Sequence, residues 1–292
     1  MPSMITRAIT ADGSARIIFT DSTAIVAKAR EIHNTSKTMT AVLGRSLTAA
    51  SLMGSLLKDK GNTLTFQIKA DGPAGAIVCV SDYKGNVRGY VDNPEVELPA
   101  NPYGKLDVGG AVGVDGRLVI IKDMGMAEPY VGMCPLVTGE IGDDVSSYFA
   151  TSEQTPTVCA LGVRVNPDLT IKSAGGFLLQ LLPGADEAVA EKIEENIAKI
   201  SSVSQMIADG MTAEEIIAVA LDGIEYQMFD EFDTDYVCPC TREKYLTALA
   251  GLSQKDIDEL EAEGEPIETV CHFCDKRFVF DIQEVLVKRA QK

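Results

Sequence analysis

Hydrophobic residues recur with two different periods along this chain, and each period marks a different kind of element. Apolar positions that alternate with polar ones predict strands, and clusters of Gly, Pro, Asn and Asp between them predict turns. The predicted strands are residues 7–10, 15–20, 64–70, 77–80, 87–91, 118–121, 159–165 and 169–172. Because short turns join several of them, we expect a mainly antiparallel sheet.

Helical periodicity is interspersed with these strands. It predicts helices at about residues 38–58 and 143–149, and a further helix that Ser22 could cap. Helices between antiparallel strands are typical of an α+β fold. We therefore predict that residues 1–183 form an α+β domain with helices packed on its sheet.

A longer helical pattern follows from Asp186 to about Leu221. Its apolar stripe consists of Val189, Ile193, Ile197, Ile200, Val203 and Ile207. Thr212 and Glu215 have the spacing of a capping box that starts another helix. We interpret residues 184–232 as a helical linker. It could be a solvated arm with one buried face, or a switchable segment, because its apolar stripe needs a surface to lie on.

The remaining region, residues 233–292, is short. A segment of about 60 residues buries too little apolar area to be securely stable without an additional staple. The predicted elements are a helix at 241–250, a second helix capped by Ser253, a hairpin over 269–280 and a last helix at 283–290. We predict a small C-terminal domain that depends on such a staple.

Four cysteines in this region form two close pairs. Cys238 and Cys240 belong to a Cys-Pro-Cys step, and Cys271 and Cys274 belong to a Cys-His-Phe-Cys step. Thiolates in two close pairs, joined by a short helical segment, suit a tetrahedral zinc ion. We predict that the four cysteines bind one Zn²⁺, whose binding energy would be folding energy for residues 233–292.

The sequence leaves the role of this zinc site open. Four thiolates leave no position for water, so catalytic zinc is disfavoured. Cys238 and Cys240 are close enough in sequence to be oxidised to each other, which would form a strained, easily reduced ring. Cys271 and Cys274 could instead be a thioredoxin-like pair, but a strand rather than a helix is expected after them. His272 could replace one cysteine, although four thiolates already suffice. An inert structural site and a redox site both remain possible.

The chain is acidic, with a formal net charge of −17. Residues 184–236 alone contain fourteen Asp and Glu against two Lys. Such a surface repels nucleic acid and anionic membranes, so we expect neither as a partner. Four basic residues flank the cysteines and would partly offset the charge of a zinc tetrathiolate centre: Arg242, Lys244, Lys276 and Arg277.

Few features point to a membrane or to secretion. The N-terminal residues lack the apolar stretch of a signal peptide. The best membrane candidate, residues 47–57, is far shorter than the roughly 20 residues needed to span a bilayer. We expect a cytoplasmic protein. In that compartment paired cysteines are more often metal ligands or redox centres than structural bridges.

Few features point to catalysis either. The chain has two histidines and no Gly-x-Ser-x-Gly motif, so a histidine-based hydrolase triad is poorly supported. Residues 109–113 are glycine-rich but precede a predicted strand, so we interpret them as turns. Cys79, Cys134 and Cys159 are expected to pack like small hydrophobic residues. We expect no enzymatic activity, no catalytic residues and no organic cofactor.

Several further segments carry a family resemblance. They are Thr138-Gly-Glu-Ile-Gly-Asp-Asp144 leading into Tyr148-Phe149, Ser152-Glu-Gln154, and Ala174-Gly-Gly-Phe-Leu-Leu-Gln180 followed by Pro183-Gly184. Together with the Cys238-Pro-Cys240 step and the Cys271 and Cys274 pair, they resemble the redox-regulated holdase chaperones called the thirty-three-kilodalton heat-shock proteins. The resemblance covers nearly the whole chain, and the cysteine pattern is its most specific part.

The resemblance implies a function. Such proteins are ATP-independent, and they are inactive while all four thiolates hold zinc. Under oxidative stress, the pairs that match Cys238–Cys240 and Cys271–Cys274 form disulfides and release the zinc. The C-terminal domain and the linker then lose structure, and the protein dimerises and binds unfolding client proteins.

We therefore expect a redox-regulated holdase that prevents aggregation of unfolding or oxidatively damaged proteins. A small domain held by metal would fall apart once its ligands are oxidised, and the linker stripe or the surface beneath it would become available to clients. The alternative is an adaptor or binding protein with a purely structural zinc module.

Overall fold

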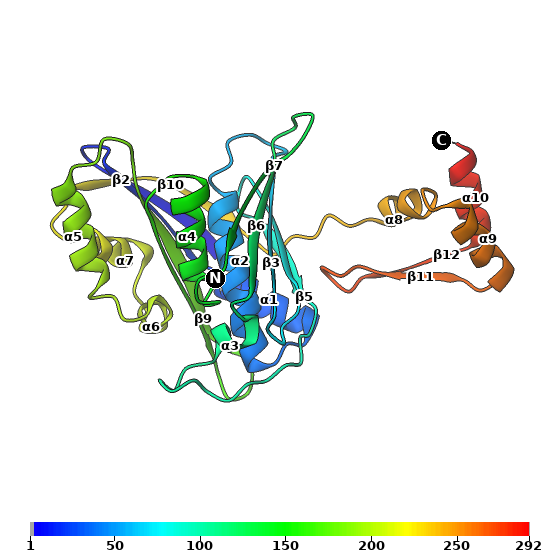
Figure 1. Ribbon diagram of the computed structural model, residues 1–292, viewed down its shortest axis with the longest axis horizontal. Coiled ribbons are helices and arrows are strands. Elements are labelled where there is room, and N and C mark those ends of the chain that lie inside the picture. The colour runs from blue at the N-terminus through cyan, green and yellow to red at the C-terminus, as the bar shows by residue number, and fades with distance from the viewer. Residues whose placement is uncertain (1–2, 292) are drawn as a thin grey trace. The chain divides into compact units, whose positions relative to one another are not determined.

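The computed structural model describes residues 3–291, which form two compact units (Figure 1). The first unit ends at Val237 and the second begins at Cys238. The first unit contains two five-stranded antiparallel sheets. Mainly antiparallel sheets with packed helices are the predicted α+β architecture. The functional division at residues 183 and 232 stays a prediction.

The two sheets of the first unit differ in how their strands follow one another. Sheet A has the order β10 (Tyr226–Thr234), β1 (Ser3–Thr10), β2 (Ala15–Asp21), β9 (Ile171–Leu181) and β8 (Thr157–Val165). Sheet B has the order β5 (Val87–Val91), β4 (Ile77–Asp82), β3 (Thr63–Ala70), β6 (Gly116–Asp123) and β7 (Tyr130–Pro135). Sheet B is built from consecutive strands, whereas sheet A joins segments from both ends of the unit.

The helix α2 (Lys37–Gly54) packs against strands of both sheets (Figure 1). Sixteen of its eighteen residues are buried, so it has almost no solvent face. Ser36 caps it, because its hydroxyl accepts a hydrogen bond from the Met39 N–H at 3.1 Å. Small residues permit the close packing: a Cβ at Gly44 would lie 2.9 Å from Val163 and Val26 side-chain atoms. The main core of the unit is built around this helix.

The preceding helix, α1 (Thr23–His33), corrects one sequence-based prediction. Ser22 occupies the N-cap position, but its side chain makes no capping hydrogen bond. Its hydroxyl instead lies 2.7 Å from the Thr48 hydroxyl, within the core. A buried hydroxyl needs a partner, and the partner available here belongs to α2 rather than to the start of α1.

The outer face of sheet A is covered by the predicted linker helices. They are α5 (Glu187–Ile197), α6 (Val203–Ala208) and α7 (Ala213–Ala220) (Figure 1). Thr212 and Glu215 form the predicted capping box. Ile193, Val203 and Ile217 are buried in one cluster with sheet residues that include Phe19 and Phe177. The apolar stripe of the linker therefore lies on the sheet, which is the surface that the sequence pattern required.

The strand β10 is not predicted by the sequence pattern. It pairs antiparallel with β1, for example Thr234 with Ser3 and Tyr226 with Thr10. Tyr236 follows it and is anchored to sheet B, since its hydroxyl donates to the Gly89 carbonyl oxygen at 2.9 Å. Residues 226–236 thus close the first unit immediately before the cysteine region.

The Thr138–Asp144 segment of the family resemblance is organised by one buried carboxylate. Asp144 is fully buried, and its oxygens accept hydrogen bonds from the backbone N–H groups of Val137 and Ile141 at 2.7 and 3.0 Å. The N–H groups of Thr138 and Gly139 lie at 3.2 and 3.4 Å. Asp144 thereby fixes the loop that enters α4 (Gly142–Ser152).

The interpretation of residues 109–113 as turns is wrong. Residues 108–112 form a short helix, α3 (Val108–Val112). Asp107 caps it by accepting a hydrogen bond from the Gly110 N–H at 3.0 Å, and Gly113 ends it at a φ of 83°. The local cap was strong enough to form one helical turn despite two consecutive glycines.

The second unit contains small elements with local caps. They are α8 (Arg242–Leu249), α9 (Gln254–Glu263), β11 (Ile267–Val270), β12 (Arg277–Phe280) and α10 (Ile282–Ala290). Thr241, Ser253 and Asp281 cap the three helices through their side chains. The buried cluster of this unit consists of Ile257, Ile267, Phe280 and Val285. Four side chains are a small core for a folded unit.

Within residues 3–291, no helix combines the length and the apolar content that a membrane-crossing helix needs.

Candidate metal centre

The four predicted cysteine ligands lie together in the second unit. Their Sγ atoms all lie within 4.8 Å of one another. Cys238 and Cys240 come from the extended segment before α8, and Cys271 and Cys274 come from the turn between β11 and β12. The structure therefore brings together both cysteine pairs that the sequence singled out.

The backbone of the second pair forms a tight turn. The Cys271 N–H donates to the Lys276 carbonyl oxygen at 3.0 Å, and the N–H groups of Cys274 and Asp275 donate to the Cys271 carbonyl oxygen at 3.2 and 2.8 Å. Asp275 has a φ of 55°, in the left-handed region that Asp tolerates better than most residues. This turn points two thiols from one hairpin toward the same place.

The sulfur separations match a tetrahedral metal site. A Zn–S bond of about 2.3 Å places the corners of a regular tetrahedron about 3.8 Å apart. Cys238 Sγ lies 3.7 Å from Cys271 Sγ, and Cys240 Sγ lies 3.3 Å from Cys274 Sγ. Four sulfur donors at such distances fit zinc. The donor set contains no histidine, since His272 is exposed and lies outside the cluster.

The thiols of the cluster are not electrostatically equivalent. Burial raises the pKa of Cys240, and hydrogen bonds from its sulfur to the neighbouring thiols raise it further. Burial would also raise the pKa of Cys271, but hydrogen bonds from the Tyr245 hydroxyl and the Phe273 N–H lower it to about 7. Cys271 is the most buried of the four. Its surroundings therefore make deprotonation easier than for an ordinary thiol.

Tyr245 is a site residue that the sequence analysis missed. It lies on α8, which begins immediately after Cys240 and Thr241, so the first turn of this helix returns toward the cysteines. Its ring packs on Phe278 with centroids 5.1 Å apart, which holds the hydroxyl near the cluster. The sequence signal that could have identified it is a Tyr placed one helical turn after a predicted ligand pair.

The four flanking basic residues have different surroundings. Lys244 Nζ donates to the Pro239 carbonyl oxygen at 3.0 Å, within the Cys-Pro-Cys step. Arg242 instead forms an ion pair with Glu284 at 2.8 Å, and Arg277 forms one with Glu268 at 2.6 Å. Among the side chains of Arg242, Lys244 and Arg277, that of Lys244 contacts the backbone of a cysteine pair, whereas the two arginines pair with carboxylates.

The three other cysteines lie apart from the cluster, in the first unit. Cys79, Cys134 and Cys159 are buried, as the sequence analysis expected. Burial raises the pKa of all three thiols. They therefore stay protonated at neutral pH and behave as packing residues.

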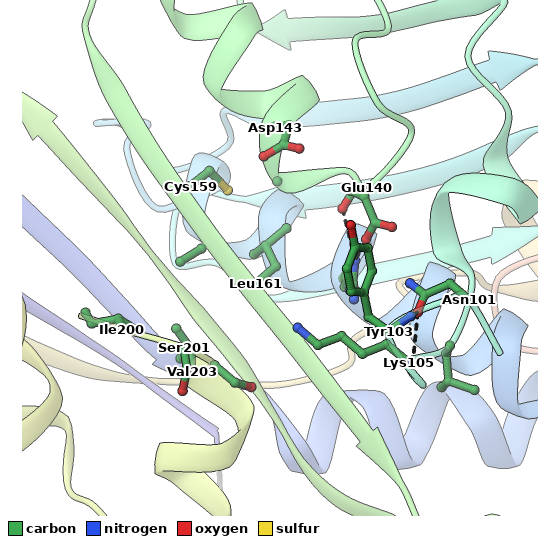
Figure 2. Close-up of a pocket in the computed structure, with 15 residues that line it drawn as sticks. Asn101, Tyr103, Lys105, Glu140, Asp143, Cys159, Leu161, Ile200, Ser201 and Val203 are labelled. Carbon is green, nitrogen blue, oxygen red and sulfur yellow. Dashed lines mark hydrogen bonds and ion pairs between the residues drawn. The ribbon is translucent and has the colours of Figure 1, made fainter. Parts of the chain in front are cut away.

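A cavity of about 400 Å³ in the first unit was considered as a second candidate site (Figure 2). It is lined by residues that include Tyr103, Glu140, Asp143 and Cys159. Glu140 is paired with Arg45, and Asp143 accepts a hydrogen bond from the Thr138 hydroxyl at 2.9 Å. The Cys159 thiol is protonated, and the residues that line the cavity include no histidine.

Comparisons with known proteins place this architecture in a family. The family model described as Hsp33 protein matches residues 3–281. The 33 kDa chaperonin of Clostridium botulinum (strain Langeland) is 45% identical over 285 residues, which cover 98% of this chain and 96% of that protein. The 33 kDa chaperonin of Clostridium tetani is 42% identical, with 98% and 97% covered.

A solved structure agrees. The crystal structure of the 33 kDa chaperonin of Thermotoga maritima matches with a TM-score of 0.91 and 35% identity, covering 100% of this chain and 99% of that one. Both sequence and structure thus match along almost the full length. The chain belongs to the Hsp33 family of chaperones.

Proposed function

We propose that this protein is a redox-regulated, ATP-independent holdase that is inactive when reduced. The observation that carries the proposal is the meeting of four thiols in a unit whose buried apolar cluster has four members. Such a unit lacks the core to be securely stable alone, so the state of its sulfur atoms decides whether it folds.

In the reduced state, the ligands are the thiolates of Cys238, Cys240, Cys271 and Cys274. A bound Zn²⁺ would supply closed coordination and the folding energy of the second unit. Hydrogen bonds from the Tyr245 hydroxyl and the Phe273 N–H lower the pKa of Cys271, which favours the deprotonated form that a metal requires. A reducing compartment, which we take to be the cytoplasm, keeps the thiols available.

Oxidation removes the ligands. Each pair of thiols loses two electrons and two protons to form one disulfide, and a peroxide that accepts them is reduced to water. We propose the pairing Cys238–Cys240 and Cys271–Cys274. The sulfur contacts at 3.7 and 3.3 Å join Cys238 with Cys271 and Cys240 with Cys274, across the two pairs, so disulfide mapping by mass spectrometry is a direct check of the pairing.

The client surface follows from the packing of the linker. The helices α5, α6 and α7 cover an apolar face of sheet A that includes Ile17, Phe19 and Phe177. Release of these helices would expose that face and the linker stripe together. Unfolded clients bind exposed apolar surface, and a second copy of the chain can bind it too, which gives the proposed active homodimer.

The test measures zinc and client protection in the same samples. Reduced and peroxide-treated protein are assayed for zinc release with a colourimetric indicator and for suppression of light scattering by an aggregating client. Cys271→Ser should lose zinc without oxidant, whereas Cys134→Ser, a buried cysteine outside the cluster, should release zinc as the unchanged protein does. Protection by fully reduced, zinc-loaded protein that equals that of the oxidised form would contradict the proposal.

The adaptor with a purely structural zinc module is the second candidate, and the closed donor set favours it as much as it favours the switch. It predicts that zinc stays bound under peroxide, or that its release leaves client protection unchanged.

A further inference from the structure

Three basic side chains line one cavity of about 350 Å³ in the first unit. They are Arg7 on β1, Arg16 on β2 and Lys58 just after α2. The other lining residues are uncharged, and they include Ser55, Leu57 and Phe229. A cavity wall with three cations and no carboxylate contrasts with the net charge of −17 of the whole chain.

The strand register explains why two arginines meet here. Arg7 pairs with Ile18, and Arg16 pairs with Ile9, across the β1–β2 ladder. Arg7 and Arg16 are therefore diagonal neighbours on the same face of sheet A, at a spacing that long side chains can reach across. This face is the one that turns toward α2, because Ile5 and Ile18 on it belong to the main core.

The existing contacts leave bonding capacity on both guanidinium groups. Arg7 reaches Asp230 at 3.3 Å and the Ser55 carbonyl oxygen, but its buried Nε has no hydrogen-bond partner among the described residues. Arg16 uses its Nε and one Nη to bind the Gln180 side-chain oxygen, at 3.0 and 2.8 Å. Gln180 is neutral, so it supplies no compensating charge.

The surroundings of both guanidinium groups disfavour their positive charge. Burial lowers the pKa of Arg7 and of Arg16, and the positive charge of Arg7 lowers the pKa of Arg16 further. Two carboxylates act against this. Asp230 is partly exposed, and Glu153 is already shared by Lys122 and the Tyr148 hydroxyl. Like charges held together at a half-buried site are a common feature of anion-binding sites.

We propose that this cavity binds a small phosphate-bearing molecule, with its phosphoryl group against Arg7, Arg16 and Lys58. Arginine forks bind phosphate oxygens in a bidentate manner, and lysine adds a point charge. The volume exceeds what a lone phosphate fills and lies in the range of small-ligand pockets. Leu57 and Phe229 form an apolar wall for the organic part of the ligand.

The site is complete while β10 is in place. Phe229 and Asp230 both lie on β10. Phe232 on the same strand packs under the Arg7 guanidinium, whose carbon lies 4.8 Å from the ring centroid. A ligand bound at the cavity therefore stabilises the state in which β10 is paired with β1. This regulatory consequence rests on the proposed function, since it assumes that the segment before the cysteines is released on activation.

The test is equilibrium binding to reduced, zinc-loaded, full-length protein at constant ionic strength, by calorimetry. The probes are pyrophosphate, phenyl phosphate and benzoate. We expect saturable one-to-one binding of phenyl phosphate, with benzoate weaker by about tenfold because a carboxylate offers fewer oxygens to three cations. Pyrophosphate lacks an apolar part but offers more oxygens than phenyl phosphate, so it separates the contribution of charge from that of the apolar wall.

Matched variants assign the binding to this cavity. Lys58→Ala removes an exposed side chain and should weaken phenyl phosphate binding about fivefold, whereas Lys60→Ala, two residues along and outside the cavity, should change it less than twofold. Arg16→Gln keeps a polar partner for Gln180 and should weaken binding at least about tenfold.

Three outcomes would overturn the site: no saturable binding of any probe, an equal loss in Lys58→Ala and Lys60→Ala, or full binding in Arg16→Gln. Equal affinity for benzoate would overturn the phosphate preference. These measurements use neither oxidant nor client, so their failure would leave the redox proposal standing. A failed zinc-release experiment would likewise leave this site standing.

Discussion

The two units of this protein are stabilised in different ways. In the first unit, α2 is buried between two sheets, and one apolar cluster extends from Ile5 to Tyr236. In the second unit, the apolar cluster has four buried members, and the four cysteines lie beside short, locally capped elements. The first unit can fold on burial of apolar area, whereas we propose that the second depends on its sulfur atoms being held together.

Under the proposed function, this difference would let one chain combine a lasting scaffold with a unit that responds to oxidation. Domains are stable by about 5–15 kcal/mol, and a structural zinc site supplies about 10–16 kcal/mol in small metal-binding domains. Loss of the proposed zinc site would remove a contribution of that size and would unfold the small unit. The three cysteines of the first unit are buried and protonated, so a peroxide that oxidises the second unit should leave them unreacted.

The largest expected effect comes from removing the metal centre. Cys271→Ser should unfold residues 238–291, because it removes the most buried of the four ligands, while the first unit keeps its fold. Hydrogen exchange followed by mass spectrometry checks this: amides of α9, β11 and β12 should exchange at unfolded rates, and those of α2 should stay protected. Protected β11 and β12 amides in the variant would show that the small core suffices.

An intermediate effect is expected from Asp144→Ala in the first unit. The change leaves four backbone N–H groups of the 137–141 loop without their acceptor, which should destabilise the first unit by about 3 kcal/mol or more. Asp143→Ala, at the exposed neighbouring position, is the control and should cost less than about 1 kcal/mol. Urea denaturation measures both. Similar losses in the two variants would contradict the assigned role of Asp144.

The smallest effect is expected from a surface ion pair of the second unit. Glu284→Gln removes the ion pair with Arg242. Because both side chains of this pair are about half exposed, the change should alter stability by less than about 1 kcal/mol. Zinc affinity, measured by competition with a chelator, should stay within a few-fold of the unchanged protein. A large loss would mean that surface charges, rather than sulfur ligands, stabilise this unit.

Much of the fold could be predicted because many elements carry local signals. Each of these signals involves residues only a few positions apart. Examples are the capping box of Thr212 and Glu215, the cap at Ser253 and the alternation in β3. The meeting of the four cysteines could also be predicted, since the two members of each pair are close in sequence. Local chemistry of this kind does not depend on knowing the rest of the structure.

Other elements depended on distant partners. The strand β7 has exposed apolar residues such as Val131 and Met133 on its outer side, so its pattern does not alternate. Residues 174–180 of β9 are buried on both faces, which removes the period-two signal and made the predicted strand end too early. Tyr245 and Arg16 gained their roles from side chains that the sequence alone could not place beside them.

The position of β10 has one further consequence. It borders sheet A and is bonded to β1 along one side, so its departure would promote β1 to be the border strand. The backbone donors and acceptors of residues 3–10 that now face β10 would then be free to form hydrogen bonds with another extended polypeptide. Main-chain hydrogen bonds do not depend on side-chain identity, so this exposed strand edge could pair with damaged proteins of many different sequences.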